Sequence, residues 1–181
     1  EHGGFGYSPA QPLQPKFPPP SNLEFLIYRL QHAKGKIEDS PEWKMLISQL
    51  DHMAMGGIRD HLGGGFHRYS VDRYWWIPHF EKMLYDNGQL ASVYSEAYKL
   101  TGDEEYKQVV EELLAFVQRE MTGEEGGFYS ALDADSEGEE GSFYRWEKEQ
   151  LEKELGAKQY RLFASAYGIN KDPNFEHDYY V

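Results

Sequence analysis

The chain contains no cysteine among its 181 residues. This absence excludes a disulfide framework, a zinc site built on thiolates and a cysteine nucleophile. The sequence also lacks an apolar run long enough to cross a membrane, and it shows no secretory leader. It starts inside its own repeat pattern, as a fragment of a longer chain would. We therefore expect a cytoplasmic protein and a fragment of a larger one.

Basic side chains are scarce as well: 18 Lys and Arg oppose 31 Asp and Glu, which gives a net charge of −13. Residues 1–90 carry 9 basic and 10 acidic side chains, whereas residues 91–181 carry 9 basic and 21 acidic ones. Nucleic acids and anionic membranes are bound by basic patches. We therefore expect neither partner, and we interpret the acidic second half as a solvated outer face.

What the sequence does contain is an internal repeat. Gly-Gly-Phe occurs at residues 3–5, 64–66 and 126–128, and Tyr-Ser follows each copy at residues 7–8, 69–70 and 129–130. A constant interval of this size indicates one supersecondary unit copied along the chain. Glycine permits a tight entry or a close backbone approach, and the following Phe can anchor the loop in the core.

The first interval predicts two helices. Asn22 can cap an apolar stripe that runs to Ala33. Ser40 is a good N-cap for a second helix that has Pro41 at its first position. Gly56-Gly57 ends that helix.

The second and third intervals repeat the plan. Pro78 is expected to open a long helix that Gly102 ends, and Asp103 is expected to cap the next helix. Two shorter helices are expected over residues 147–155 and 158–167. The segment 75–77 can pair briefly as a strand. The chain is therefore predicted to be all-α: three helical hairpins in one domain over residues 1–181, with the glycine triplets gathered at one end.

The densest chemistry lies between Asp60 and Asn87. This stretch contains three His, two Arg, one Lys, four acidic residues and several aromatic residues. Aromatic rings offer flat stacking faces, and neighbouring charged groups shift each other's pKa. A glycine-rich loop flanked by such groups is suited to a small polar molecule.

The segment from Met55 to Asn87 carries Gly-Gly-Gly-Phe-His-Arg-Tyr-Ser-Val-Asp and Pro-His-Phe-Glu-Lys-Met-Leu-Tyr-Asp-Asn. It closely resembles the spermatogenesis-associated, thioredoxin-domain-containing family. Pro15-Lys16-Phe17-Pro18, the acidic run 133–137 and the segment 140–144 match too. The segment 173–177 departs from the family pattern, because Pro173 and His177 stand where glycines are expected.

The resemblance implies a thioredoxin-like domain followed by an (α/α)-toroid similar to N-acylglucosamine 2-epimerase and six-hairpin glycosidases. The chain then corresponds to the first half of the toroid, without the thioredoxin-like domain. Three hairpins in 181 residues also amount to half of a six-hairpin ring. An open half-ring exposes its edge, so we expect self-association or the remainder of the toroid and a thioredoxin-like domain as partners.

The resemblance implies an undefined but carbohydrate-directed activity, of isomerase or epimerase type before hydrolase type, on a sugar-like ligand. The candidates for proton transfer and catalysis are His61, His67, His79, Asp72 and Glu81. The candidates for substrate binding are Arg68, Tyr69, Trp75, Trp76, Tyr85, Asp133 and Asp135. Each has a structural alternative: His79 and Glu81 can lie in a helical first turn, and Arg68 can pair with Asp60 or Asp72.

No cofactor and no metal are predicted. Asp133, Asp135 and Glu137 begin like a calcium-binding EF-hand loop, but Tyr144 stands where the bidentate glutamate belongs. The alternative function is a non-catalytic ligand-binding or scaffolding module that works with a thioredoxin-like domain. Convergence of the three histidines and Asp72 on one cavity would favour the enzyme, and their dispersal would favour the module.

Overall fold

The computed structural model describes residues 2–5, 14–176 and 178–181. These residues fall into two compact units, Glu1–Ala134 and Asp135–Val181, and each is described by itself. The single domain expected over residues 1–181 stays a prediction. The first Tyr-Ser pair, at residues 7–8, and His177 lie outside the described residues.

The first hairpin of unit 1 consists of α1 (Pro20–Gln31) and α2 (Pro41–Met55). The Ser40 hydroxyl accepts a hydrogen bond from the N–H of Trp43 at 3.1 Å, which confirms the predicted cap. The expected cap of α1 at Asn22 is wrong. The helix begins at Pro20, because proline suits a first turn whose N–H groups have no helical partner.

The second hairpin consists of α3 (Leu84–Thr101) and α4 (Glu104–Glu120). Gly102 ends α3 in the left-handed conformation, with φ of 73°. The Asp103 carboxylate accepts a hydrogen bond from the N–H of Glu105 at 3.0 Å and so caps α4. Both helix boundaries confirm the sequence prediction.

Residues 78–83 correct the sequence prediction. They do not open a helix; they form β2 (Pro78–His79) and β3 (Lys82–Met83). The strand β2 pairs with β1 (Tyr69–Ser70), and β3 pairs with β4 (Ala131–Leu132), both antiparallel. Distant segments satisfy these backbone groups, so tertiary pairing overrides the local helix signal. The fold is a set of helical hairpins with small sheets, and not strictly all-α.

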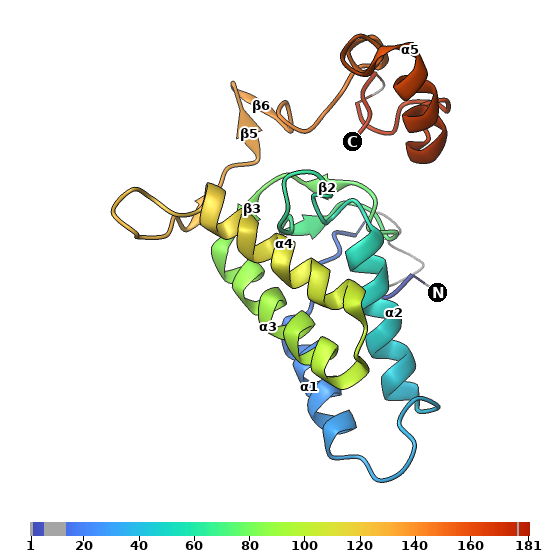
Figure 1. The fold of residues 1–181 in the computed structure, drawn as a ribbon, viewed down its shortest axis with the longest axis vertical. Helices are drawn as coiled ribbons and strands as arrows, with labels where there is room; N and C mark the ends of the chain where they lie inside the picture. The colour runs from blue at the N-terminus through green and yellow to red at the C-terminus, as the bar shows by residue number, and fades with distance from the viewer. Residues whose placement is uncertain (1, 6–13, 177) are drawn as a thin grey trace. The chain divides into compact units, whose positions relative to one another are not determined.

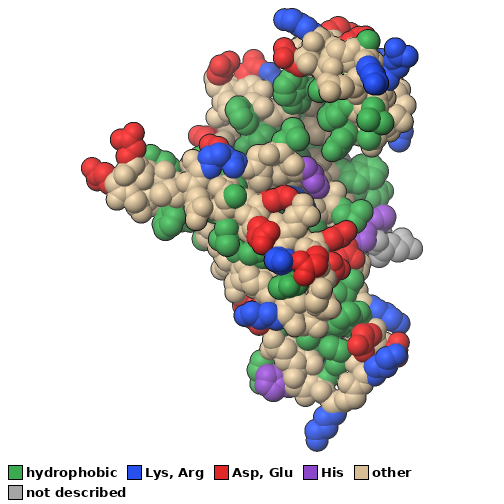
Figure 2. Space-filling model, in the orientation of Figure 1, with side chains coloured by type: hydrophobic (Ala, Val, Ile, Leu, Met, Phe, Trp, Pro, Cys, Tyr) green, Lys and Arg blue, Asp and Glu red, His purple; other side chains and the backbone are tan. Residues whose placement is uncertain are grey.

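The core of unit 1 lies among its helices, where α3 packs against both α1 and α4. Its members are apolar side chains at helical spacing together with residues of the connecting loops. They include Leu23, Leu26, Ile27, Leu46, Leu50, Met53, Ile58, Phe66, Trp75, Leu90, Val93, Tyr94, Tyr106, Val109 and Leu113. Charged side chains of both signs lie between apolar ones on the surface that Figure 2 shows.

The glycine triplets gather at one end of the four helices, as predicted. Figure 1 shows the C-terminal ends of α2 and α4 at this end, and the second and third triplets follow them. Gly3, in the first triplet, lies against α2: a Cβ atom there would be 3.1 Å from the Cα atom of Gln49. We call the loops 56–83 and 121–134 at this end the glycine rim.

Unit 2 contains β5 (Asp135–Ser136), β6 (Glu139–Glu140) and α5 (Lys148–Tyr167). Gly156, with φ of 68°, kinks α5 at the stop expected between two shorter helices. A small core forms around Leu151, Tyr160 and Tyr180. No helix in the described ranges is long and apolar enough to cross a membrane.

Candidate functional site

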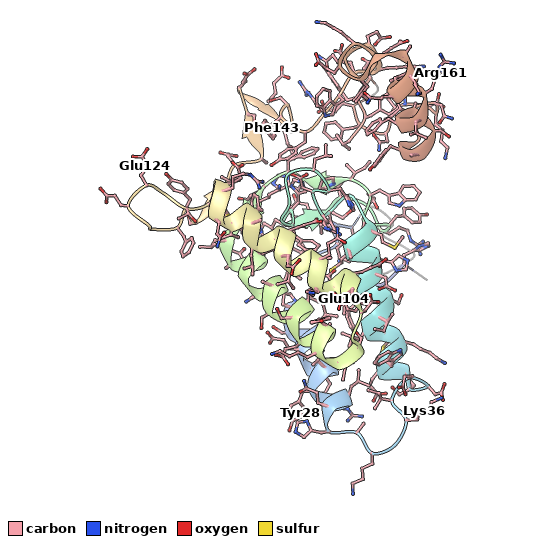
Figure 3. The ribbon with its side chains drawn as sticks, viewed as in Figure 1. Tyr28, Lys36, Glu104, Glu124, Phe143 and Arg161 are labelled. Carbon is pink, nitrogen blue, oxygen red and sulfur yellow. The ribbon has the colours of Figure 1, made fainter. Side chains whose placement is uncertain are left out.

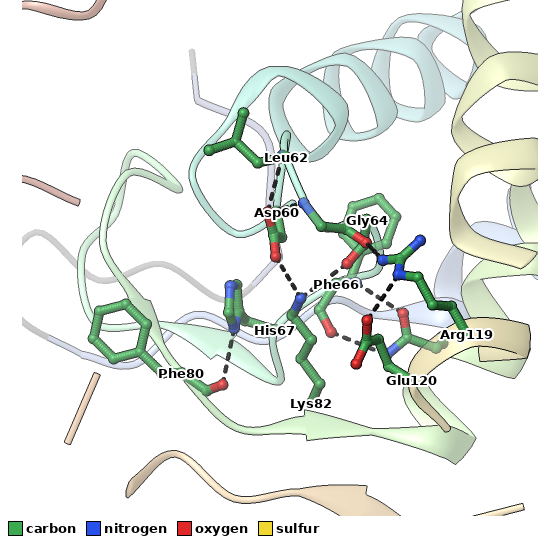
Figure 4. Close-up of polar contacts among 11 residues, drawn as sticks. Asp60, Leu62, Gly64, Phe66, His67, Phe80, Lys82, Arg119 and Glu120 are labelled. Carbon is green, nitrogen blue, oxygen red and sulfur yellow. Dashed lines mark hydrogen bonds and ion pairs between the residues drawn. The ribbon is translucent and has the colours of Figure 1, made fainter. Parts of the chain in front are cut away.

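A buried ion pair between Lys82 and Asp60 lies within the glycine rim (Figure 4). The Lys82 ammonium donates to the Asp60 carboxylate at 2.7 Å and to the carbonyl of Gly64 at 2.9 Å. It also lies 4.5 Å from the ring centroid of Phe116 on α4. Lys82 therefore ties the loop around Gly63–Gly65, which we call the glycine loop, to β3 and to the second hairpin.

Charge and burial compete in this pair. Burial lowers the pKa of the Lys82 ammonium, and the attraction of Asp60 only partly opposes that effect. Burial acts to raise the pKa of the Asp60 carboxyl, but the charge and hydrogen bond of Lys82 outweigh it and lower that pKa. The Asp60 carboxylate also accepts the N–H groups of Leu62 and Gly63, at 2.9 and 2.7 Å. The carboxylate thus joins Lys82 to the backbone of the glycine loop.

The side-chain amide of Asn87 holds the glycine loop against the first turn of α3. Asn87 is fully buried; its Oδ1 accepts the N–H of Phe66 at 2.8 Å, and its Nδ2 donates to the carbonyl of Phe66 at 3.0 Å. The same Nδ2 donates to the carbonyl of Met83 at 2.9 Å. Asn87 therefore holds residue 66 as a neighbouring strand would.

The three candidate histidines differ in burial and in their neighbours. His67 is 2% exposed, and its Nδ1 lies 3.0 Å from the carbonyl oxygen of Phe80. Burial lowers the pKa of His67 to about 3, so its ring is neutral at physiological pH. His61 is exposed, and its Nε2 lies 3.0 Å from the carbonyl oxygen of Gly56. His79 stacks on Tyr69 with ring centroids 4.7 Å apart. His61 and His67 thus lie against different backbone carbonyls, and His79 acts electrostatically on His67.

Asp72 shapes the tip of the β1–β2 hairpin. Its Oδ1 accepts the N–H groups of Tyr74 and Trp76, at 2.5 and 3.3 Å, and its Oδ2 accepts the N–H of Ile77 at 2.6 Å. Trp75 is fully buried, whereas Trp76 is 63% exposed. Of the two candidate stacking residues, only Trp76 therefore presents its ring at the surface.

A second charged cluster lies at the base of the same hairpin. The Arg68 guanidinium donates to the Glu81 carboxylate at 3.0 Å, and the N–H of Arg68 donates to the carbonyl of Glu81 at 2.9 Å. Asp86 and Tyr85, in the first turn of α3, act electrostatically on Arg68. Arg68 thus pairs with Glu81, and not with Asp60 or Asp72.

The second carboxyl of this cluster is that of Asp86, whose pKa is raised. It is half-buried, and its Oδ2 atom is shielded from solvent with no hydrogen-bond partner among the described residues. Burial raises its pKa to about 6, the nearby Arg68 charge acts to lower it, and the Glu81 charge acts to raise it. A carboxyl that titrates near neutral pH can give and take protons.

The remaining candidates divide between the units. Tyr69 lies in β1 of unit 1, where Phe17 contacts its ring at a centroid distance of 4.8 Å. Asp133 is an exposed residue after β4, whereas Asp135 belongs to β5 of unit 2. Within the described ranges, no group of three or more His, Asp or Glu side chains is arranged to hold a metal ion.

Sequence reasoning missed Asp86 and Asn87 as site residues. Both lie on the first turn of α3, directly after the charged stretch. The signal available was the Asp-Asn pair itself, because polar residues so close to an apolar helical stripe need partners when buried. Their importance depends on burial and on partners more than ten residues away, which spacing alone does not reveal.

The chain is similar to curated proteins over most of its length. It is 51% identical over 137 residues to human spermatogenesis-associated protein 20, an alignment that covers 75% of this chain and 16% of that protein. It is 44% identical over 171 residues to an uncharacterised protein of Caenorhabditis elegans, with 87% of this chain and 22% of that protein covered. The chain therefore spans about a fifth or less of these relatives. No profile of a known protein family matches it.

Two solved structures share the fold. A cellobiose 2-epimerase from Spirochaeta thermophila superposes with a TM-score of 0.61 at 17% identity, over 73% of this chain and 33% of that chain. A sugar epimerase from a ruminal bacterium gives 0.54 at 17% identity, over 63% and 28% of the two chains. The resemblance drawn from the sequence motifs and the epimerase-like hairpin fold are confirmed. Identity this low supports the fold alone.

Proposed function

We infer that this chain, a close relative of spermatogenesis-associated protein 20, supplies part of a carbohydrate-acting toroid of sugar isomerase or epimerase type. The fold it shares with two sugar epimerases supports this assignment. The glycine rim is its active face, since loops held by a rigid helical scaffold commonly carry sites. A hydrolase-like activity is the alternative within the same class. We propose as well that the longer protein acts on a sugar and contains a thioredoxin-like domain.

The Asp86 carboxyl is the observation that carries the proposal. Epimerisation beside a carbonyl requires a group that removes a proton from carbon and a group that returns one. Such a group works best when its pKa lies near the working pH, and burial brings that of Asp86 to about 6. Its Oδ2 is shielded from solvent and has no hydrogen-bond partner among the described residues, which is the environment that raises the pKa of a carboxyl.

The surrounding residues have complementary roles in this proposal. Arg68 and Glu81 hold each other at 3.0 Å, which places a cation and a second carboxylate near Asp86. The exposed ring of Tyr85 precedes Asp86 on α3. His67 has a structural role in this proposal and transfers no proton, because its buried ring stays neutral.

A second candidate function rests on the backbone contacts of two histidines. His61 and His67 each lie within hydrogen-bonding distance of a different backbone carbonyl, as ring nitrogens with structural duties do. This arrangement favours a ligand-binding or scaffolding module that presents a client to a thioredoxin-like domain. The two functions differ in turnover, which is directly measurable.

The test is a turnover assay on the full chain in deuterium oxide, with a panel of reducing sugars and sugar phosphates. NMR detects solvent deuterium at the carbon beside the carbonyl, which marks an isomerase or epimerase. Assay of new reducing ends detects a hydrolase. Asp86→Asn should lower the rate at least 100-fold, in line with the loss of a general acid or base.

Glu96→Gln is the matched control, because Glu96 is an acidic residue of the same helix that pairs with Lys99. It should leave the rate unchanged. Turnover that survives Asp86→Asn would remove Asp86 from the mechanism. Sugar binding without deuterium exchange or hydrolysis across the panel would establish the binding module instead.

A further inference from the structure

The second and third glycine triplets build the same backbone structure. Phe66 pairs with Arg59, and Phe128 pairs with Thr122, each through a single antiparallel bridge. In both bridges the flanking residues make the hydrogen bonds, so the N–H and carbonyl of the Phe point to the opposite side. The repeat in the sequence is therefore a repeat of main-chain geometry as well.

In the second triplet, the hairpin of α3 and α4 occupies that opposite side. The Asn87 amide bonds both main-chain groups of Phe66, at 2.8 and 3.0 Å. The Phe66 ring stacks on Tyr94 of α3 at a centroid distance of 5.6 Å. A Cβ atom at Gly65 would lie 2.4 Å from the ring of Phe116 on α4. Phe66 is fully buried as a result.

The first triplet also packs on the hairpin that follows it in the sequence. Gly3 lies against α2, the second helix of the first hairpin, where a Cβ atom would be 3.1 Å from the Cα atom of Gln49. Two copies of the triplet therefore share one arrangement: the loop is covered by the next helical hairpin.

The third triplet differs, because no described residue covers it. A Cβ atom at Gly126 or Gly127 would meet nothing within 4 Å. Phe128 is 61% exposed, Tyr129 is 55% exposed, and the main-chain N–H and carbonyl of Phe128 have no hydrogen-bond partner in the described ranges. The loop projects from the C-terminal end of α4, where Figure 3 labels Glu124. Exposed rings beside unpaired main-chain groups form a surface suited to another segment.

The geometry also defines the chemistry of that segment. One side chain must accept the N–H of Phe128 and donate to its carbonyl, which an Asn or Gln amide can do and an ionised carboxylate cannot. Glu149, in the first turn of α5, follows Asn87 at the interval that separates the two triplets. Gln150 beside it already accepts the N–H of Glu147. The next helix of this chain thus lacks the required amide at the equivalent position.

We propose that the third glycine triplet is a docking surface for a further helical hairpin of the longer protein, outside the 181 residues of this chain. The first turn of its leading helix brings an Asn or Gln amide to the main chain of Phe128. An aromatic residue of the same helix covers the Phe128 ring, and its second helix packs on Gly127. The inference goes beyond the proposed sugar chemistry and does not depend on it, because it follows from the repeat.

Main-chain hydrogen exchange, compared by mass spectrometry between this chain and the longer protein, tests the proposal. The Phe128 amide should exchange freely in this chain and at least about 100-fold more slowly in the longer protein, because a hydrogen-bonded amide exchanges only when the structure opens. The Phe66 amide is the control, since Asn87 bonds it already, and it should be protected in both. Equal exchange at Phe128 in the two proteins would refute the docking surface.

Phe128→Ala and Phe66→Ala are a matched pair of variants. Phe128→Ala should lower the melting temperature of the longer protein by at least about 5 °C and leave that of this chain unchanged, since the ring is exposed here. Phe66→Ala should lower both melting temperatures. If Phe128→Ala destabilises this chain as much as the longer protein, the cover comes from this chain or from a second copy, and the proposed occupant is wrong.

Photochemical cross-linking from p-benzoylphenylalanine at residue 128 of the longer protein identifies the occupant. Attachment to a helical peptide outside the 181 residues supports the proposal. Attachment to residues 135–181 or to a second molecule, or no attachment at all, would overturn it. None of these outcomes alters the turnover assay of Asp86→Asn, so failure of the docking surface is distinguishable from failure of the proposed function.

Discussion

The ammonium group of Lys82 lies 2.7 Å from the carboxylate of Asp60, 22 residues away in the sequence. The lysine side chain is only 1% exposed and that of the aspartate is 12% exposed. Desolvation of two charges offsets much of their mutual attraction, so the pair is not in itself a large source of stability. Its value is geometric, because it fixes the glycine loop against β3 and therefore the position of the neighbouring Glu81.

Removal of one partner of this ion pair should be strongly destabilising. Lys82→Met leaves the Asp60 carboxylate buried without its counter-charge, and we expect a loss of about 3–5 kcal/mol in the free energy of unfolding. Urea denaturation monitored by tryptophan fluorescence measures it. Lys107→Met removes an exposed lysine that pairs with Glu104, and it should change stability very little. Equal effects of the two substitutions would show that Asp60 is not desolvated.

His67 should make stability fall as the medium is acidified. Its pKa is lowered from 6.5 to about 3 in the folded chain, so the unfolded chain binds the proton more readily between these values. The stabilisation is therefore complete above pH 6.5 and is lost as the pH falls towards 3, with a slope of at most about 1.4 kcal/mol per pH unit. The difference in unfolding free energy between the wild type and His67→Gln, followed from pH 7.5 to 4.5, isolates this contribution. A difference independent of pH would contradict it.

The titration of Asp86 should respond in opposite directions to its two charged neighbours. Its pKa is raised to about 6 chiefly by burial, with Arg68 acting to lower it and Glu81 acting to raise it. Arg68→Met should therefore move the pKa upward, and Glu81→Gln should move it downward. The carbon-13 shift of the Asp86 carboxyl, followed by NMR against pH, measures both. A midpoint near 4 in the wild type would show that the group is fully solvated.

Equivalent glycines of the internal repeat should differ in their tolerance of alanine. Gly65 and Gly127 occupy the same repeat position, but Gly65 has a φ of 79° and a Cβ there would lie 2.4 Å from the ring of Phe116. Gly65→Ala combines left-handed strain with overpacking and should cost about 2–5 kcal/mol. Gly127 has nothing within 4 Å and no positive φ, so Gly127→Ala should be nearly neutral. Thermal denaturation of the two variants makes the comparison.

Local signals predicted the helical hairpins well. Ser40, Gly102 and Asp103 carry cap chemistry that depends on residues a few positions away, and the structure confirms each. The kink at Gly156 follows from the same kind of local evidence. At these positions a few neighbouring residues decide the conformation, whereas the cap expected at Asn22 was wrong because α1 begins two residues earlier, at Pro20.

The candidate site was less predictable, because distant segments decide it. Pro78 reads as the first residue of a helix, yet the segment it opens pairs with β1 and β4 instead. The burial of Lys82 depends on α4, more than thirty residues away in the sequence. Patterns of residue type locate the chemistry to one stretch, but tertiary contacts decide which groups are solvent-shielded.

The amide of Asn87 gives the glycine rim a particular freedom. It bonds only to main-chain groups, the N–H and carbonyl of residue 66 and the carbonyl of Met83, so the anchorage of the loop to α3 does not depend on the side chains of the loop. Exposed side chains such as those of His61 and Leu62 can then be substituted without moving the loop backbone. Substitutions at such exposed positions can therefore change what the loop binds, while the backbone hydrogen bonds that hold the loop stay the same.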